Sequence, residues 1–147
     1  MSVPNISMGP PVVKSLRKAV PRGRSFFDCH MMVSNPDQWV DVFAECGAGN
    51  ASLISSDSDL YCFHIEALNS DEEIDQVITH VKNKGMKVGI AIKPKTPSSA
   101  LYKWIPKIDM ALVMVILHLL ILITDSRTRL RRTKSHHVLF CQSLRSP

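Results

Sequence analysis

The feature that most constrains the fold is a short apolar stretch at residues 26–33, which reads Phe-Phe-Asp-Cys-His-Met-Met-Val. Side chains of an extended strand alternate between its two faces. One face of this stretch is entirely apolar, with Phe27, Cys29, Met31 and Val33. The other carries Asp28, His30 and Met32. So little charge on either face is typical of a parallel sheet that is buried on both sides, as in a barrel of strands and helices.

Three more strands are predicted downstream, at residues 60–66, 86–93 and 108–114. Helical patterns precede or separate the four strands at residues 12–20, 36–46, 71–84 and 97–104. The second helix is expected to be capped by Ser34 and Asn35 with Pro36 at its first position, and the third by a capping box from Ser70 to Glu73. Strands that alternate with helices at these spacings indicate an α/β fold with about four βα units.

If these strands belong to a barrel, their alternation predicts which side chains face the axis. The predicted set is Asp28, His30, Met32, His64, Glu66, Gly89, Ala91, Lys93, Met110, Leu112 and Met114. His30, Glu66 and Lys93 lie toward the carboxyl ends of their strands, where α/β barrels keep their chemistry. Glu66 and Lys93 are equally consistent with a structural ion pair, and Asp28 is a candidate partner of either.

The net charge of +5 belongs to the C-terminal part of the chain. Residues 1–114 contain 12 Lys and Arg against 12 Asp and Glu, whereas residues 115–147 contain six Lys and Arg against one Asp. The basic run at 127–134 has no interleaved aromatic residues, so we interpret it as a solvated charge run. The apolar run at 110–123 is shorter than the ~20 residues that a membrane helix needs. We therefore expect neither a nucleic-acid partner nor a membrane partner.

The four cysteines, at positions 29, 46, 62 and 141, show no metal-type spacing and lie in strand or helix patterns. This usage indicates a reducing compartment. Residues 1–9 show no signal-peptide pattern, and we expect a cytoplasmic protein.

Five segments, in order along the chain, carry a resemblance to a known family. They are residues 3–6 (Val-Pro-Asn-Ile), 27–33 (Phe-Asp-Cys-His-Met-Met-Val), 63–67 (Phe-His-Ile-Glu-Ala), 85–89 (Gly-Met-Lys-Val-Gly) and 108–114 (Ile-Asp-Met-Ala-Leu-Val-Met). Together they resemble ribulose-phosphate 3-epimerase over roughly residues 3–114. The resemblance implies a TIM barrel that interconverts D-ribulose 5-phosphate and D-xylulose 5-phosphate in the pentose phosphate pathway. It implies the transfer of one proton at C3, between two aspartates on opposite faces of an enediolate.

The resemblance also implies a divalent metal ion (iron, zinc, manganese or cobalt), which the two aspartates and two histidines hold, and methionines that wall the intermediate. His30 matches one of the metal-binding histidines, and His30, Met32 and Met114 are the predicted substrate-binding residues. Without the resemblance, His30 would more often be a hydrogen-bonded core histidine. Met32 and Met114 would more often fill a core.

The chain departs from the family in three places. No residue matches either catalytic aspartate. Residues 51–59 form a polar insertion, which we expect on the face away from the chemistry and therefore to be the most tolerable of the three departures. Residues 115–147 replace the family's glycine-rich segments with a divergent apolar and then basic tail, which we expect to lie outside the fold.

We therefore interpret residues 1–114 as a partial TIM barrel within a truncated chain. A catalytic metal needs about three protein ligands, and proton abstraction needs a positioned base. We expect the chain alone to be inactive and to bind no metal. The alternative is a non-catalytic fragment that associates with a full-length epimerase subunit or with a second copy, because a partial barrel leaves open sheet edges.

Overall fold

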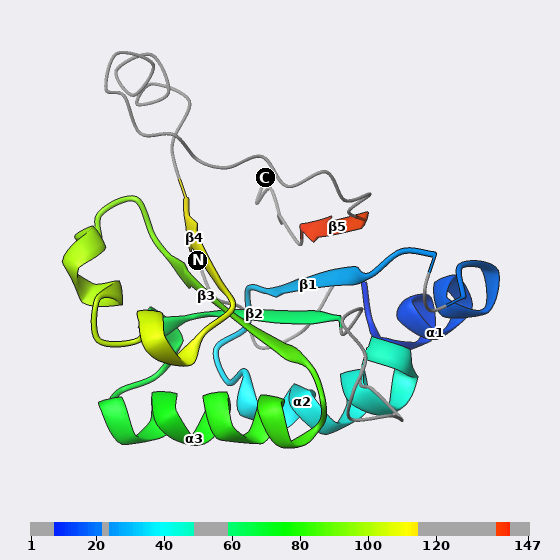
Figure 1. Cartoon of the computed structure of the whole chain (residues 1–147), viewed down its shortest axis with the longest axis horizontal. Helices are drawn as coiled ribbons and strands as arrows, with labels where there is room; N and C mark the ends of the chain where they lie inside the picture. The colour runs from blue at the N-terminus through cyan, green and yellow to red at the C-terminus, as the bar shows by residue number, and fades with distance from the viewer. Residues whose placement is uncertain (1–7, 22–23, 49–58, 115–137, 142–147) are drawn as a thin grey trace, which may run out of the picture.

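The computed structural model of the chain describes residues 8–21, 24–48, 59–114 and 138–141. These residues form one sheet with α2 (Asp37–Phe43) and α3 (Asp71–Asn83) packed along one side of it (Figure 1). The first helix, α1 (Pro10–Ala19), lies near the end where the first strand begins. Within the described part of the chain, no helix combines the length and the apolar character that crossing a membrane requires.

The sheet is parallel throughout. Its strands are β1 (Phe27–Met31), β2 (Leu60–His64), β3 (Lys87–Ile92), β4 (Met110–Val113) and β5 (Val138–Cys141). They lie in the order β4-β3-β2-β1-β5, so β1 to β4 are neighbours in chain order. Parallel neighbours need crossover connections, and α2 and α3 supply two of them. The predicted α/β class is therefore confirmed.

The position of β5 differs from the expectation that residues 115–147 lie outside the fold. β5 pairs with the free side of β1, with Phe27 opposite Val138 and His30 opposite Cys141. Pairing satisfies backbone N–H and C=O groups that an open edge of β1 would leave without partners in the sheet. Residues 115–137 and 142–147 of the predicted tail lie outside the described residues.

The strands β1, β2 and β3 are buried on both faces, as the apolar pattern predicts, whereas β4 alternates half-buried and exposed residues. Every residue of β1 and β2 is buried, and β3 is buried from Val88 onward. The large core cluster includes side chains of the helices and one face of the strands, among them Val40, Tyr61 and Val81. A smaller cluster on the opposite face contains Leu60, Cys62 and Ala91, with Met110 and Leu112 packed against it.

The helix ends follow local chemistry, with one correction. The Ser70 side chain accepts a hydrogen bond from the backbone N–H of Glu73 at 3.2 Å, so the predicted capping box of α3 is confirmed. In α2, Pro36 itself is the N-cap and no side-chain capping bond forms, because the proline ring has no oxygen that could accept one. α2 continues into the π-helical turn η1 (Ala44–Ala48), in which Gly47 has a φ of 105° that favours glycine.

Two predicted elements are shorter than expected. The chain leaves β2 at His64 and forms the 3₁₀ turn η2 (Ile65–Ala67). The predicted helix at 97–104 is replaced by the 3₁₀ turns η3 (Ser98–Leu101) and η4 (Ile105–Lys107). Pro106 lacks the backbone N–H with which an α-helix over these residues would continue past residue 104.

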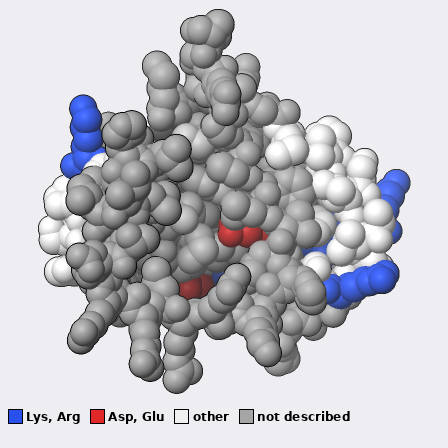
Figure 2. Space-filling model, turned by 90° about the horizontal axis from the view of Figure 1, so that it is seen from above, with Lys and Arg blue, Asp and Glu red and all other residues white. Residues whose placement is uncertain are grey.

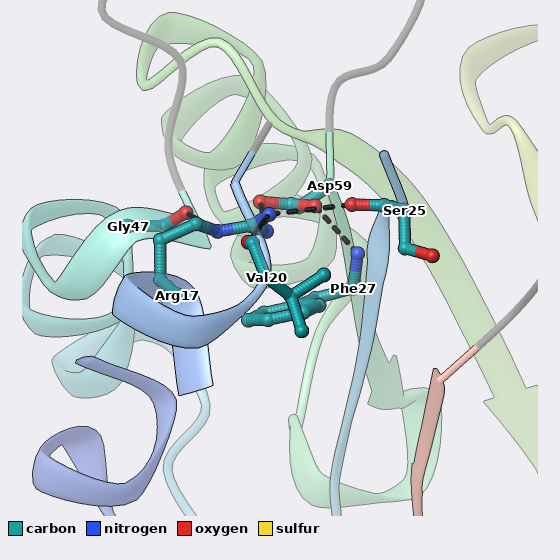
Figure 3. A network of polar contacts seen from close by, with 6 residues as sticks. All are labelled: Arg17, Val20, Ser25, Phe27, Gly47 and Asp59. Atoms are coloured by element: carbon teal, nitrogen blue, oxygen red, sulfur yellow. Dashed lines mark hydrogen bonds and ion pairs between the residues drawn. The ribbon is translucent and has the colours of Figure 1, made fainter. Parts of the chain in front are cut away.

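A buried ion pair ties α1 to the amino ends of β1 and β2 (Figure 3). Arg17 Nη2 lies 2.5 Å from Asp59 Oδ2, and the Arg17 guanidinium stacks 3.6 Å from the centroid of the Phe27 ring. Asp59 Oδ1 accepts a hydrogen bond from the Phe27 backbone N–H at 2.5 Å. Arg17 also donates to the backbone carbonyls of Val20, Ser25 and Gly47.

Asp59 is the last residue of the predicted insertion at 51–59, and its side chain is 2% exposed. Although the insertion is the departure expected to be the most tolerable, its last residue, Asp59, is thus a buried partner of Arg17. Residues 51–58 lie outside the described residues.

Candidate active site

Two histidines meet at the carboxyl ends of β1 and β2. The register places His30 opposite Cys62, so His30 and His64, two residues beyond Cys62, share the face opposite the helices. Their Nε2 atoms are 2.9 Å apart, and the residues are only 3% and 1% exposed. Alternation along each strand predicts that both histidines face the barrel axis. Their direct contact depends on the strand register, which the sequence does not reveal.

Glu66, in η2, lies beside Nδ1 of His64, the ring nitrogen that does not contact His30. Its Oε2 lies 3.4 Å from His64 Nδ1. Its Oε1 accepts hydrogen bonds from the Thr96 hydroxyl and, at 2.7 Å, from the backbone N–H of Lys93. The ion pair considered for Glu66 and Lys93 is thus replaced by a contact to the main chain of Lys93. Burial opposes ionisation of Glu66, but the hydrogen bonds from Thr96 and Lys93 prevail and lower its pKa.

Both histidines favour the neutral state. Burial lowers the pKa of His30 to about 4, and the neighbouring His64 adds to this shift. Burial also lowers the pKa of His64, although the Glu66 carboxylate opposes it. Since a neutral imidazole has one N–H and one accepting nitrogen, the 2.9 Å contact requires one Nε2 to donate and the other to accept.

The two predicted wall methionines follow the ends of different strands. Met32 comes directly after β1 and Met114 directly after β4, and both are half-buried. The backbone N–H of Met114 donates to the carbonyl of Ile92 at 3.1 Å, which continues the β3–β4 pairing by one residue. β2 and β3 lie between β1 and β4 in the sheet, so Met32 and Met114 follow strands that are not neighbours. Contact of either methionine with a substrate stays a prediction.

The family-type metal site is not assembled from the described residues. Among them, no group of three or more His, Cys, Asp or Glu side chains is placed to hold a metal ion. His30 is in place, but its Nε2 faces His64. In the view from above, carboxylates are visible near the middle of the molecule and described Lys and Arg lie at its edges (Figure 2).

Parallel βα units with titratable side chains at the carboxyl ends of the strands define a class of protein: α/β barrels, or parts of one. The sequence comparisons agree with this class. A sequence model described as the Ribulose-phosphate 3 epimerase family matches residues 1–117 of the 147. The chain belongs to the ribulose-phosphate 3-epimerase family, a TIM-barrel family, and covers part of that barrel.

Individual relatives agree with the family assignment. The ribulose-phosphate 3-epimerase of Eremothecium gossypii is 47% identical over 122 residues, which cover 78% of this chain and 46% of the relative. That of Schizosaccharomyces pombe is 42% identical over 114 residues, covering 78% and 44%. A rice protein named as the cytoplasmic isoform is 32% identical over 117 residues, covering 78% and 45%. The chain thus spans about half the length of the curated relatives it matches.

Proposed function

We propose that the chain supplies the middle strands of a ribulose-phosphate 3-epimerase active site, which interconverts D-ribulose 5-phosphate and D-xylulose 5-phosphate by metal-assisted proton transfer at C3. One observation carries this proposal. In a chain of this family, His30, His64 and Glu66 gather at the carboxyl ends of parallel strands, where α/β barrels keep their chemistry.

The roles of the residues follow from their places. His30 contributes one of the metal-binding side chains, and Met32 and Met114 contribute apolar, polarisable surface beside the reacting carbons. Apolar walls exclude water from an enediolate. A bound divalent ion supplies stabilisation of the developing oxyanion. Because the described residues provide one of the family's ligands, we assign no step through a metal to this chain alone.

We further propose that the 147-residue polypeptide does not epimerise pentose phosphates by itself. The resemblance matches none of its residues to the two proton-transferring aspartates, and loss of catalytic residues that act as a unit costs factors of roughly 10⁴ to 10⁶. A coupled assay for xylulose 5-phosphate formation, with added iron(II) or zinc(II), tests this directly. We expect no rate above the blank.

A positive rate in that assay has to be separated from contaminating host enzyme. The matched control is His30→Ala, purified in the same way. Activity at an ordinary enzymatic rate that His30→Ala abolishes would overturn the proposal of inactivity. A rate that His30→Ala leaves unchanged is contamination and leaves the polypeptide itself inactive, as proposed.

Association with a complete epimerase subunit is a second candidate function. Within the described part of the sheet, β4 pairs with β3 alone, and Val113 is 49% exposed. An edge strand of this kind offers backbone groups to another chain. We expect the full chain to co-sediment with a full-length epimerase, and Val113→Lys to weaken this association because charge on an edge strand opposes pairing. Independent sedimentation of the two proteins would exclude this function.

We also propose a cytoplasmic location. Cys29, Cys46 and Cys62 are free cysteines, which is typical of a reducing compartment. The name of the rice relative gives the same location. Fractionation of cells that express the tagged full chain would test this, and recovery with an organelle fraction would contradict it.

A further inference from the structure

A pocket opens on the helix side of the sheet, at the end where β1 and β2 stop. It is formed by the chain that follows β1, the chain that follows β2 and the first two turns of α3. Its volume is about 320 Å³, which is enough for a small ligand or for one long side chain. Val77, which lines the pocket, belongs to the core on the helix side, whereas His30 and His64 share the opposite face of the sheet. The pocket is therefore separate from the candidate active site.

The charged side chains that line this pocket all have one sign. Asp37, at the start of α2, and Glu73, in the first turn of α3, contribute carboxylates. Among the described residues that line it, none is Lys or Arg. The neutral polar side chains are those of Ser34, Asn35, Asn69 and Gln76. Negative charge surrounded by oxygen acceptors favours a cation that donates several hydrogen bonds.

Both carboxylates are oriented by a bond that uses only one of their oxygens. Glu73 Oε2 accepts a hydrogen bond from the backbone N–H of Asn69 at 2.8 Å, and Asp37 Oδ1 lies 2.8 Å from Nδ1 of His80. Glu73 Oε1 and Asp37 Oδ2 take no part in these two bonds, so each carboxylate keeps an oxygen for a ligand. Groups that are already held in place lose little freedom on binding. A protonated His80 offsets part of the Asp37 charge, so Glu73 is the stronger source of negative charge in the pocket.

The rest of the lining is apolar and suits a short alkyl chain. It consists of Ala67, Leu68 and Val77, and Val77 is almost fully buried. A bare metal ion does not fit this lining, since no group of three or more His, Cys, Asp or Glu in the described part of the chain is placed to hold one. A guanidinium group has donors spread over a planar fork, so it can reach acceptors on two elements at once, whereas an ammonium group is a point charge.

We propose that this pocket binds an alkylguanidinium group, which donates to Glu73 and Asp37 while its alkyl chain lies against Leu68 and Val77. The group can come from a free small molecule or from an arginine side chain of a partner protein, and both present the same chemistry. This inference goes beyond the proposed epimerase function, in which none of the lining residues has a role. Its test does not use turnover, so failure of one proposal is distinguishable from failure of the other.

Amide NMR spectra of the full chain, titrated with N-acetyl-arginine amide, test the site. The matched ligand is N-acetyl-citrulline amide, in which a neutral urea of nearly the same shape replaces the guanidinium. We expect the arginine compound to shift the amide signals of Ala67, Leu68 and Asn69 in a saturable way, and the citrulline compound to leave them unchanged at the same concentrations. Absence of a saturable shift with the arginine compound, or equal shifts with the two compounds, would overturn the proposal.

Glu73→Gln removes the charge on which binding depends and keeps the fold, because glutamine can replace glutamate in a capping box. We expect this variant to bind the arginine compound about 5- to 10-fold more weakly, between the effects typical of exposed and of buried charged hydrogen bonds. Glu72→Gln is the matched control, since it makes the same change at the neighbouring exposed position of α3, outside the pocket, and should leave the affinity unchanged. Circular dichroism establishes that both variants are folded. Equal weakening in the two variants would mean general attraction to acidic groups and would refute a site at this pocket.

Agmatine separates the two sources of the ligand. It carries an alkylguanidinium group without the flanking peptide groups of N-acetyl-arginine amide. Tighter binding of the blocked arginine would assign the pocket to a side chain of a partner protein. Equal or tighter binding of agmatine would assign it to a free small cation. If neither compound binds, the pocket is not a guanidinium site.

Discussion

The guanidinium of Arg17 is the most consequential single group outside the candidate site. It pairs with Asp59, whose side chain is 2% exposed, and the pair joins α1 to the amino ends of two strands (Figure 3). Removal of one partner of a buried pair leaves the other charge without compensation, at a cost of about 3–5 kcal/mol. We therefore expect Arg17→Met, which keeps much of the alkyl stem, to lower the free energy of unfolding by about that amount in urea denaturation.

The matched control for Arg17→Met is Lys107→Met, which removes an ion pair that is exposed to solvent. Lys107 Nζ lies 2.6 Å from Asp75 Oδ1, and the two side chains are 48% and 45% exposed. Exposed pairs contribute about 0–1 kcal/mol. Equal losses of unfolding free energy in the two variants would show that the buried pair stabilises the fold no more than an exposed pair does.

At the candidate site, the sequence predicts which face of a strand a side chain occupies. It does not predict the strand register, which determines which side chains touch. The axis-facing positions of His30 and His64 follow from period-two alternation along β1 and β2, whereas Glu66 lies beyond β2 in the turn η2, where that alternation no longer applies. The contact between His30 and His64 requires β1 and β2 to pair with His30 opposite Cys62, and a shift of register would separate the rings. Thr96, which holds Glu66, lies in a loop, where no periodic signal places a side chain.

Among the elements, α3 offers a direct test of local stabilisation. Ser70 Oγ accepts the backbone N–H of Glu73, and Glu73 Oε2 accepts the backbone N–H of Asn69. Loss of an N-cap side chain costs about 1 kcal/mol. We expect Ser70→Ala to lower stability in urea by that amount. Ser98→Ala, at an exposed serine in η3, should change it by less than about 0.5 kcal/mol, and an equally large loss there would contradict the capping role.

The contact between α2 and α3 should depend on pH through His80. Its Nδ1 lies 2.8 Å from Asp37 Oδ1 and its Nε2 3.0 Å from Asp41 Oδ1. The hydrogen bond to Asp37, supported by Asp41, raises the pKa of His80 above its usual 6.5, although burial opposes the shift. Stabilisation by the charged imidazole is therefore fully present below pH 6.5 and is lost as pH rises through the raised value.

NMR titration of the His80 ring measures this shift. In parallel, the stability difference between the chain and His80→Gln should be largest in mild acid and should vanish at high pH. Asp37→Asn should move the titration midpoint of His80 downward. A His80 ring that titrates at or below its usual pKa in the folded chain would refute the charge-dependent contact.

Element identity was largely predictable, whereas element ends were not. The strands β1 to β4 lie within the predicted stretches, since apolar runs buried on both faces are distinctive. The predicted helix at 97–104 gives way to 3₁₀ turns, which an apolar pattern over so short a stretch does not distinguish from an α-helix. β5 was missed because its segment lies in a tail with no strand-and-helix alternation around it.

At the scale of the whole molecule, the two edges of the sheet are where this part of a barrel differs from a closed barrel. In a closed barrel every strand has two neighbours. Here β1 has β2 on one side and β5 on the other, whereas β4 has only β3 among the described strands. β5 thus occupies the position beside β1 that a closed barrel would fill with another strand. The stability of this half of the sheet then depends on residues far along the chain.

Substitution of Leu139 by proline tests that dependence. β5 pairs with β1 so that Leu139 lies opposite Asp28, and proline removes the backbone N–H and disfavours pairing within a sheet. We expect Leu139→Pro to release β5, so that the amides of residues 27–31 directed at β5 exchange faster with deuterium. Residues 87–92 in β3, two strands away, should keep their protection and serve as the internal reference. If exchange in β1 is the same with and without the substitution, β5 does not hold this edge in solution, and β1 is open to pairing with another chain.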